Sequence, residues 1–177
     1  SLYISGGTEG FRFGTDLSYN HEGGVMKKSY RNRMSVGIYV DYRVGKLQIR
    51  NNVSYDLARS SDSPYGSFSD YTKQQPYYPI YDDNGKLLQM LAIGIPNPLY
   101  EATLGNFSRG ESSNLTNNLS FYWFINDHLQ LQSQFSVTKN DSEDKDFTDP
   151  LSTKYGSSDN PFTRGSLSVS STNNFNW

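Results

Sequence analysis

Residues 33–57 read RMSVGIYVDYRVGKLQIRNNVSYDL, and this stretch decides the fold class. Apolar side chains occupy alternate positions on both sides of a turn at residues 43–46, and polar side chains fill most positions between them. Alternation with a period of two over about ten residues predicts β-strands whose two faces meet different surroundings. Two architectures satisfy this pattern: a soluble sheet with one dry face, and a membrane barrel with lipid outside and a wet lumen inside.

The same alternation recurs along most of the chain, while helix-forming residues are scarce. We therefore predict an all-β, antiparallel, up-and-down fold. About seven strands are expected, at residues 2–5, 11–20, 33–42, 47–57, 115–123, 129–137 and 167–177.

The connections between these segments alternate in length. Short turns are predicted near residues 7–10, 43–46 and 125–128, and long connectors at residues 21–29, 58–113 and 140–164. In an up-and-down sheet all short turns then lie at one edge and all long loops at the other. Outer-membrane barrels have this asymmetry, with short periplasmic turns and long extracellular loops. A soluble sandwich has no physical reason to sort its loops, so the pattern favours a transmembrane β-barrel segment with a long extracellular loop at residues 58–113.

Composition narrows the function classes further. The net charge of −2 gives no concentrated basic face, so nucleic acid is not an expected partner. No apolar run reaches the roughly 20 residues of a transmembrane helix. The sequence contains no cysteine, so disulfide and thiolate chemistry are excluded.

Aromatic and charged residues fall on opposite parities of the predicted strands. One aromatic group is expected near the short-turn edge, namely Phe11, Phe13, Tyr42, Phe121 and Trp123. A second is expected toward the long-loop edge of the same face, namely Tyr19, Tyr55 and Phe135. Two such bands are typical of the girdles at membrane interfaces. The opposite parity is predicted to line a lumen through Arg12, Asp16, Arg33, Asp41, Arg50 and Asp56.

Three stretches carry a resemblance to a known family. They are EGGVMKKSYRNRMSVGIYVDYRVGKLQIRNNVSY at residues 22–55, SPYGSFSDYTKQQPYYPIYDDNGK at 63–86 and NPLYEATLGNFS at 97–108. Together they resemble the barrel portion of the SusC/RagA family of TonB-dependent outer-membrane transporters of Bacteroidetes. The resemblance implies a place in the bacterial outer membrane, in contact with its lipid. It also implies import of oligosaccharides or peptides powered through TonB, with a SusD-like surface lipoprotein as partner.

The family pattern is incomplete in this sequence. The plug domain that contacts TonB is absent, and large barrels of this type use about 22 strands. We therefore expect residues 1–177 to form part of a single β-barrel domain, an incomplete wall of about seven strands. Contact with TonB would run through the missing plug region.

The strongest candidates for ligand binding are aromatic residues of the long loop. Tyrosine supplies contact area at low entropic cost together with a hydroxyl group, which suits recognition of sugars or proteins. The competing interpretation is that these rings pack the loop onto itself. The candidate residues are Tyr65, Tyr71, Tyr77, Tyr78, Tyr81 and Tyr100.

Enzyme chemistry has little support. His21 and His128 are expected in connectors at opposite edges, and no nucleophile motif is present. The acidic run at residues 141–146 suggests a solvated loop before it suggests a calcium site, and residues 82–85 suggest a turn. No catalytic residue, metal or cofactor is therefore predicted. The alternative to the transporter segment is a soluble secreted β-sheet module that binds glycans or proteins.

Overall fold

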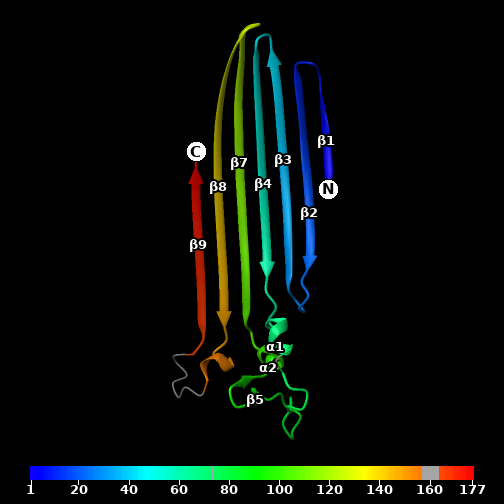
Figure 1. Cartoon of the computed structure of the whole chain (residues 1–177), viewed down its shortest axis with the longest axis vertical. Helices are drawn as coiled ribbons and strands as arrows, with labels where there is room; N and C mark the ends of the chain where they lie inside the picture. Colours follow the sequence, from blue (N-terminus) through cyan, green and yellow to red (C-terminus); the bar gives the residue numbers. More distant parts are fainter. Residues whose placement is uncertain (73, 157–163) are drawn as a thin grey trace.

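The computed structural model describes residues 1–72, 74–156 and 164–177. They form one antiparallel sheet of seven strands in the order β1-β2-β3-β4-β7-β8-β9 (Figure 1). The strands are β1 Leu2–Gly7, β2 Phe11–Gly23, β3 Tyr30–Val44, β4 Leu47–Ser61, β7 Phe107–Asn126, β8 Leu129–Thr148 and β9 Ser166–Asn176. The predicted β class and the seven antiparallel strands in up-and-down order are confirmed.

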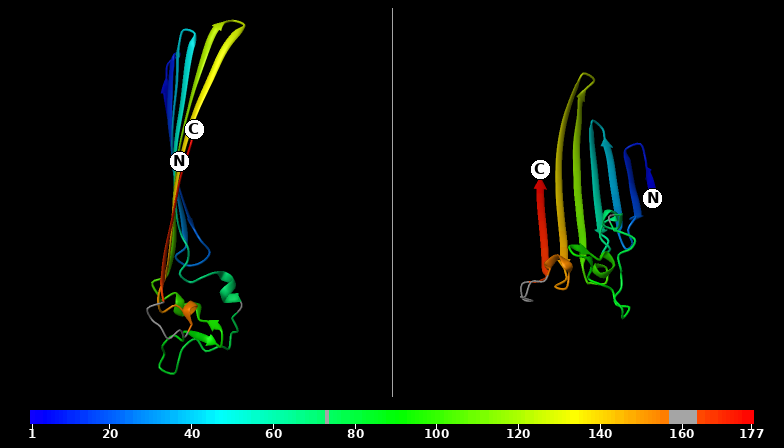
Figure 2. Two further views of the ribbon diagram at one scale, coloured as in Figure 1. Left: turned by 90° about the vertical axis from the view of Figure 1, so that its left-hand side faces the viewer. Right: turned by 60° about the horizontal axis from the view of Figure 1, so that its bottom comes forward.

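The sheet is twisted and open, and it is not curled into a barrel (Figure 2). Seen edge-on it is a single layer. Among the described residues, β1 pairs only with β2 and β9 only with β8. A barrel closes only when its edge strands are paired, so the described sheet has two free edges.

Short turns and long connections lie at opposite ends of the sheet, as the sequence predicts. The turns at residues 8–10, 45–46 and 127–128 share one end, which is uppermost in Figure 1. At the second turn Gly45 has φ 57°, the left-handed conformation that favours glycine at the first position of a two-residue hairpin. The strands β2, β4 and β8 end at the opposite end of the sheet, where residues 24–29, the long loop after β4 and residues 149–156 begin the long connections.

The strands are longer at the long-loop end than the sequence predicts. The loop expected at residues 58–113 occupies residues 62–106, and the connector expected at 140–164 begins at residue 149. The additional strand residues, next to the loop end of β7 and β8, carry mostly polar side chains on both faces and therefore show no alternation. Their backbones nevertheless pair between the two strands. The rest of that connector at residues 157–163 lies outside the described residues.

Short elements occupy the connections at this end. They are the helices α1 Phe68–Thr72 and α2 Pro98–Glu101, the paired strands β5 Met90–Ala92 and β6 Ile95–Pro96, and the single 3₁₀ turn η1 Thr153–Tyr155. We call residues 62–106 and 149–156 together the loop body.

Cross-strand register assigns each side chain to a face, because paired residues in an antiparallel sheet point to the same side. One face carries what we call the apolar belt, and the opposite face, the polar face, is hydrophilic from β1 to β9. The belt consists of Leu2, Ile4, Phe11, Phe13, Leu17, Tyr19, Met34, Val36, Ile38, Val40, Tyr42, Val44, Leu47, Ile49, Val53, Tyr55, Leu57, Leu115, Leu119, Phe121, Trp123, Leu129, Leu131, Phe135 and Val137.

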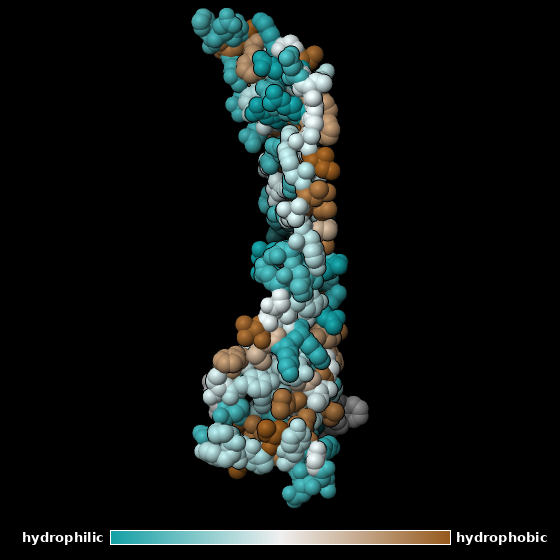
Figure 3. All heavy atoms as spheres, turned by 90° about the vertical axis from the view of Figure 1, so that its right-hand side faces the viewer, coloured by the Kyte–Doolittle hydropathy of each residue, from teal (hydrophilic) through white to brown (hydrophobic). Residues whose placement is uncertain are grey.

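No second layer covers either face of the sheet within the described residues. Ile38, at the centre of β3, is 49% exposed, and Phe121 of β7 is 44% exposed. The buried residues of the described part are Gly14 and four members of the loop body, namely Leu91, Asn97, Tyr100 and Ser152. Figure 3 shows the belt as a hydrophobic strip on one side of the upper sheet, with hydrophilic atoms opposite. The sheet therefore has no hydrophobic core of its own.

One close packing contact crosses the polar face near its β1 edge. Gly14 of β2 pairs with Tyr39 of β3, and a Cβ added at Gly14 would lie 2.2 Å from Cε1 of the Tyr39 ring. The ring therefore occupies the space above the glycine, and its hydroxyl lies 3.1 Å from the hydroxyl of Tyr3. Only glycine permits this approach.

We predict that Gly14→Ala destabilises the sheet by about 1–3 kcal/mol relative to Gly23→Ala, because the new methyl group displaces the Tyr39 ring. Gly23 is the matched control, since nothing lies within 4 Å of a Cβ built there. Both variants gain strand propensity from alanine, which cancels in the comparison. Equilibrium urea unfolding followed by tryptophan fluorescence measures the difference, and equal shifts in the two variants would contradict the prediction.

Candidate functional site

The charged residues predicted to line a lumen lie together on the polar face. Register aligns Arg12 of β2 with Asp41 of β3 and Arg50 of β4. The Arg50 guanidinium donates to the Asp41 carboxylate at 3.0 Å, and Gln48 donates to the same carboxylate at 2.7 Å. The remaining members of this set are Asp16, Arg33 and Asp56. That this face lines a lumen stays a prediction.

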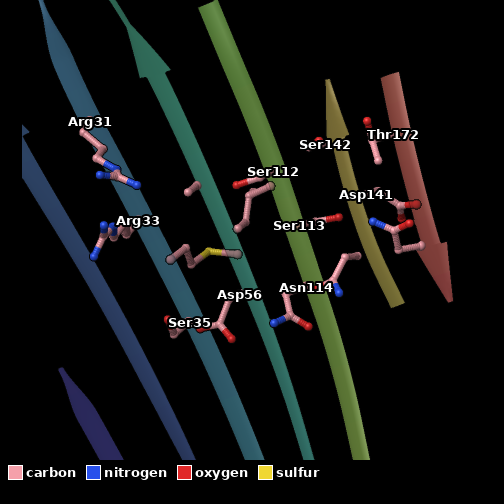
Figure 4. A pocket seen from close by; sticks show the side chains of 15 residues that line it. Arg31, Arg33, Ser35, Asp56, Ser112, Ser113, Asn114, Asp141, Ser142 and Thr172 are labelled. Atoms are coloured by element: carbon pink, nitrogen blue, oxygen red, sulfur yellow. Dashed lines mark hydrogen bonds between the residues drawn. The ribbon is translucent and has the colours of Figure 1, made fainter. Parts of the chain in front are cut away.

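A shallow trough of about 430 Å³ crosses the polar face toward the long-loop end (Figure 4). Its floor is a row of small side chains in register, Ala58, Ser112, Ser142 and Thr172, contributed by β4, β7, β8 and β9. The adjacent row toward the turns carries Asp56, Asn114, Asn140 and Asn174. Small residues beside amides leave a polar hollow in the sheet surface.

Two arginines of β3 stand at one end of this trough. Arg31 and Arg33 are both exposed, and neither forms an ion pair among the described residues. Glu22, which is in register with Arg31, accepts a hydrogen bond from Asn20 at 2.7 Å. Asp56 accepts from Ser35 at 2.6 Å. The two guanidinium groups are therefore available to an incoming anion.

The loop body has a small core of its own around Asn97, which is 1% exposed. Its side-chain oxygen accepts from the backbone N–H of Leu99 at 3.1 Å and so caps α2. Its amide nitrogen donates to the carbonyls of Leu88 at 2.7 Å and Ile80 at 3.3 Å. One side chain thus joins three segments of the long loop.

Glu101, at the end of α2, connects the long loop to the connection after β8. Its carboxylate accepts from the hydroxyl of Ser152 at 2.9 Å and from the backbone N–H of Thr153 at 2.7 Å. It also accepts from the Thr153 hydroxyl at 2.5 Å and from the Asn106 amide at 3.1 Å. The connection at residues 24–29 also joins this assembly, because the Ser63 hydroxyl donates to the carbonyl of Lys27 at 2.6 Å.

The six candidate tyrosines occupy different environments in the loop body. Tyr77 and Tyr81 are 74% and 55% exposed, and Tyr77 forms an edge-on ring pair with half-buried Tyr78. Tyr65 is half-buried beneath the Lys28 ammonium, which lies 5.7 Å from its ring centroid.

The other two candidates, Tyr100 and Tyr71, are buried or half-buried within the loop body. Tyr100 is only 9% exposed and donates its hydroxyl to the carbonyl of Leu151 at 3.4 Å. Burial raises the pKa of the Tyr71 hydroxyl, which finds no hydrogen-bond partner among the described residues. Packing therefore accounts for Tyr71 and Tyr100, whereas recognition by the exposed Tyr77 and Tyr81 stays a prediction.

A larger cavity of about 940 Å³ lies between the loop body and the adjoining ends of β7 and β8. Tyr65, Ile95 and Phe107 supply apolar walls, and Asp62 and Lys154 supply charges. Tyr65 is the only candidate tyrosine on this wall. The cavity is large enough for a small ligand, since such sites are typically about 300–1,000 Å³.

Several polar residues lie elsewhere than predicted. His21 is in β2 rather than in a connector, and its Nδ1 lies 2.5 Å from Oδ1 of Asn32. The acidic run at residues 141–146 belongs to β8, not to a loop, so its side chains alternate between the two faces. Asp141 pairs with Lys139 at 2.8 Å. The turn predicted at residues 82–85 is confirmed, because Asp82 accepts from the N–H groups of Asn84 and Lys86.

The described residues contain no group of three or more His, Cys, Asp or Glu side chains that could hold a metal ion. In the same part of the chain, the helices are too short and too polar to cross a membrane. Comparison with known protein families and with curated proteins finds no match for this chain. The resemblance to the SusC/RagA family therefore stays a prediction.

The trough and the Glu101 contacts are not apparent from the sequence. Arg31 shares the parity of Arg33, which is the only local signal for the arginine pair. The asparagines and serines of the trough come from strands far apart in the chain, so only register brings them together. Glu101 follows the recognisable NPLY stretch, but its partners lie about 50 residues later.

We predict that Glu101→Gln loosens the connection after β8 from the long loop. A hydrogen bond to a charged acceptor contributes about 1.5–3 kcal/mol, so the Thr153 amide should exchange with solvent at least about tenfold faster. Asp83→Asn is the matched control, because it removes the same charge from an exposed residue of the same loop. Hydrogen–deuterium exchange of residues 149–156 reports the change, and unchanged protection would contradict the assigned role of Glu101.

Proposed function

We propose that this chain forms part of the wall of an outer-membrane β-barrel, with the apolar belt against lipid and the polar face toward a wet lumen. The observation that carries the proposal is the belt itself, an apolar surface that runs from β1 to β8 and that no described residue covers. Monomeric soluble proteins rarely expose a continuous apolar surface of this extent. Lipid chains can cover such an apolar surface, and water in a lumen can hydrate the opposite, polar face.

The belt runs obliquely across the strands, as tilted barrel strands require. On β2 the belt ends at Tyr19. The residue of β8 in the same cross-strand row as Tyr19 is Asp141. On β8, however, the belt ends at Val137, which is 141 − 137 = 4 residues nearer the turns. The strands β2, β3, β4, β7 and β8 are successive neighbours, so the belt shifts by about one residue per strand.

The boundary at the turn side is displaced by the same amount. Register carries Phe11 of β2 to Ser133 of β8, whereas the belt on β8 begins at Leu129, which is 133 − 129 = 4 residues away. With a rise of about 3.3 Å per residue and a strand spacing of about 4.8 Å, one residue per strand corresponds to a tilt of about 35°. Outer-membrane barrel strands tilt by about 35–45°.

The height of the belt also suits a bilayer. On β4 it runs from Leu47 to Leu57, about 33 Å along the strand and about 27 Å in height at this tilt. Barrels present an apolar band about 25 Å tall. Beyond the belt on the same face stand charged residues, including the ion pair of Arg59 with Glu111 at 2.9 Å. Charges at this position favour a strand that continues past the membrane into water.

Aromatic residues mark the two limits of the belt. At the turn side the rings of Phe11 and Phe13 lie 5.8 Å apart, and Trp123 stands one paired row further out. At the opposite side Tyr19 and Tyr55 end the belt or lie next to its end. Phe135 likewise lies two residues from Val137, where the belt ends on β8, so the oblique course of the belt places it beside this edge as well. Aromatic rings therefore stand at both limits of the belt.

The loop body supports a role in solute entry. Figure 3 shows it projecting to the side opposite the hydrophobic strip, and Ser108 and Asp146 of the polar face line its cavity. Loops that lean over a lumen meet a solute before it enters. Together with the family resemblance, this favours a SusC/RagA-like TonB-dependent importer of oligosaccharides or peptides. A SusD-like lipoprotein would cover the loops, and TonB would act through a plug.

The free edges of the sheet fit the same proposal. In lipid every backbone N–H and C=O must be paired, so β1 and β9 would each require a neighbouring strand. The soluble secreted binding module remains the alternative, and the exposed Tyr77 and Tyr81 would suit it. That alternative requires another protein surface over the whole belt.

We predict that Ile38→Lys prevents stable membrane insertion while Ser54→Lys does not. Ile38 lies in the middle of the belt, and Ser54 is an exposed polar-face residue on the adjacent strand. Lysine at the bilayer midplane of a barrel costs about 2–4 kcal/mol on the lipid face. The full-length protein is expressed in a Gram-negative host, and outer-membrane recovery and unfolding in lipid vesicles are measured. Recovery of wild type and both variants in the soluble fraction would contradict the proposal and favour the soluble module.

A further inference from the structure

We propose that the trough on the polar face binds an acidic oligosaccharide, with Arg31 and Arg33 holding its carboxylate groups. This inference rests on the proposed function and names the class of solute that this wall recognises. Figure 4 shows the two arginines on β3 at one end of the trough, with hydroxyl and amide side chains of β7, β8 and β9 extending from them.

The arginines supply the charge selectivity. They are two residues apart on one strand, so their side chains leave the same face about 7 Å apart along it. Elsewhere on this face Arg50 is engaged by Asp41 at 3.0 Å, but Arg31 and Arg33 have no carboxylate partner among the described residues. A guanidinium group binds a carboxylate through two parallel hydrogen bonds. The pair is therefore arranged to hold one or two carboxylates.

The rest of the trough suits sugar hydroxyl groups. Asn140 and Asn174 project their amides from neighbouring strands, and Ser112, Ser142 and Thr172 add hydroxyls. Each asparagine offers both a donor and an acceptor, which matches the paired hydroxyls of a sugar ring. No hydrogen bond to another side chain engages the Asn140 or Asn174 amide in the described structure.

Apolar side chains are almost absent from the trough, which distinguishes sugars from peptides. Of its lining residues, Met34 and Leu57 belong to the belt, so register directs their side chains to the opposite face. Ala58 is the one apolar side chain left on the polar face there. Peptide side chains would favour hydrophobic walls, whereas a shallow polar hollow of about 430 Å³ accepts a short hydrophilic chain.

The position of the trough fits the path of an incoming solute. Its arginines lie on the strand β3 that begins at Tyr30, immediately after the connection at residues 24–29, and its far end reaches Thr172 of β9. The trough therefore lies on the polar face at the level where the belt ends on the side of the loop body. An acidic oligosaccharide released from the loops would meet these arginines next.

Trigalacturonic acid is the probe that tests this inference, and its fully methyl-esterified form is the matched neutral probe. Binding to the full-length protein in detergent is measured by isothermal titration calorimetry. We expect the double variant Arg31→Gln/Arg33→Gln to weaken binding of the acid by about 10- to 100-fold. The neutral ester should bind more weakly than the acid and be unaffected by the substitutions. Added salt should weaken binding of the acid alone.

Arg109→Gln is the control variant, because it removes the same charge at the same end of the sheet but from the belt side. It should leave binding of both probes unchanged. The inference is overturned if trigalacturonate does not bind, or if the double variant binds it as tightly as the wild type. Binding of triglutamate in place of trigalacturonate, with the same dependence on the arginines, would assign the trough to acidic peptides instead. Correct membrane insertion with any of these results would leave the proposed barrel wall intact.

Discussion

The structure depends on the apolar belt, a surface that the described residues leave uncovered. The strands pair with one another except along the free edges of β1 and β9, but within the described residues neither a second sheet nor a helix lies against the apolar belt. In water such a sheet has no hydrophobic core to offset the entropy of ordering its strands. The medium or partner that covers the belt therefore supplies the main stabilisation. The oblique course of the belt and the polar opposite face both follow from this if the covering medium is a bilayer.

The loop body solves a different physical problem. The long connections have only a small apolar core, around Leu91 and Tyr100, and polar side chains supply much of the order. Asn97 joins three segments of one loop, and Glu101 joins that loop to the next connection. The result is a pre-formed end surface, so the exposed Tyr77 and Tyr81 are presented by a scaffold that is already ordered.

Alternation in the sequence predicts the seven strands and both of their faces, because side-chain parity in a strand is a local property. The ends of β7 and β8 next to the loop body could not be predicted in this way. Around Glu111 and Glu143 both faces carry polar side chains, so these segments are recognised as strands only from their pairing. The trough could not be predicted either, because Asn114, Asn140 and Asn174 come together by register alone. The tyrosine-rich stretch is recognisable in sequence, but only packing distinguishes buried Tyr100 from exposed Tyr77.

Accessibility along β4 shows whether lipid covers the belt. The chain contains no cysteine, so single spin labels can be introduced by cysteine substitution. Each residue of Leu47–Ser61 is labelled in turn in the lipid-reconstituted full-length protein, and collisions with oxygen and with a water-soluble nickel complex are compared. If the belt faces lipid, we expect oxygen contact at odd positions from Leu47 to Leu57, nickel contact at even positions, and nickel contact on both parities from Arg59 onward. Nickel contact at Ile49, Val53 and Tyr55 equal to that of their neighbours, or exclusion of both reagents there, would contradict this expectation.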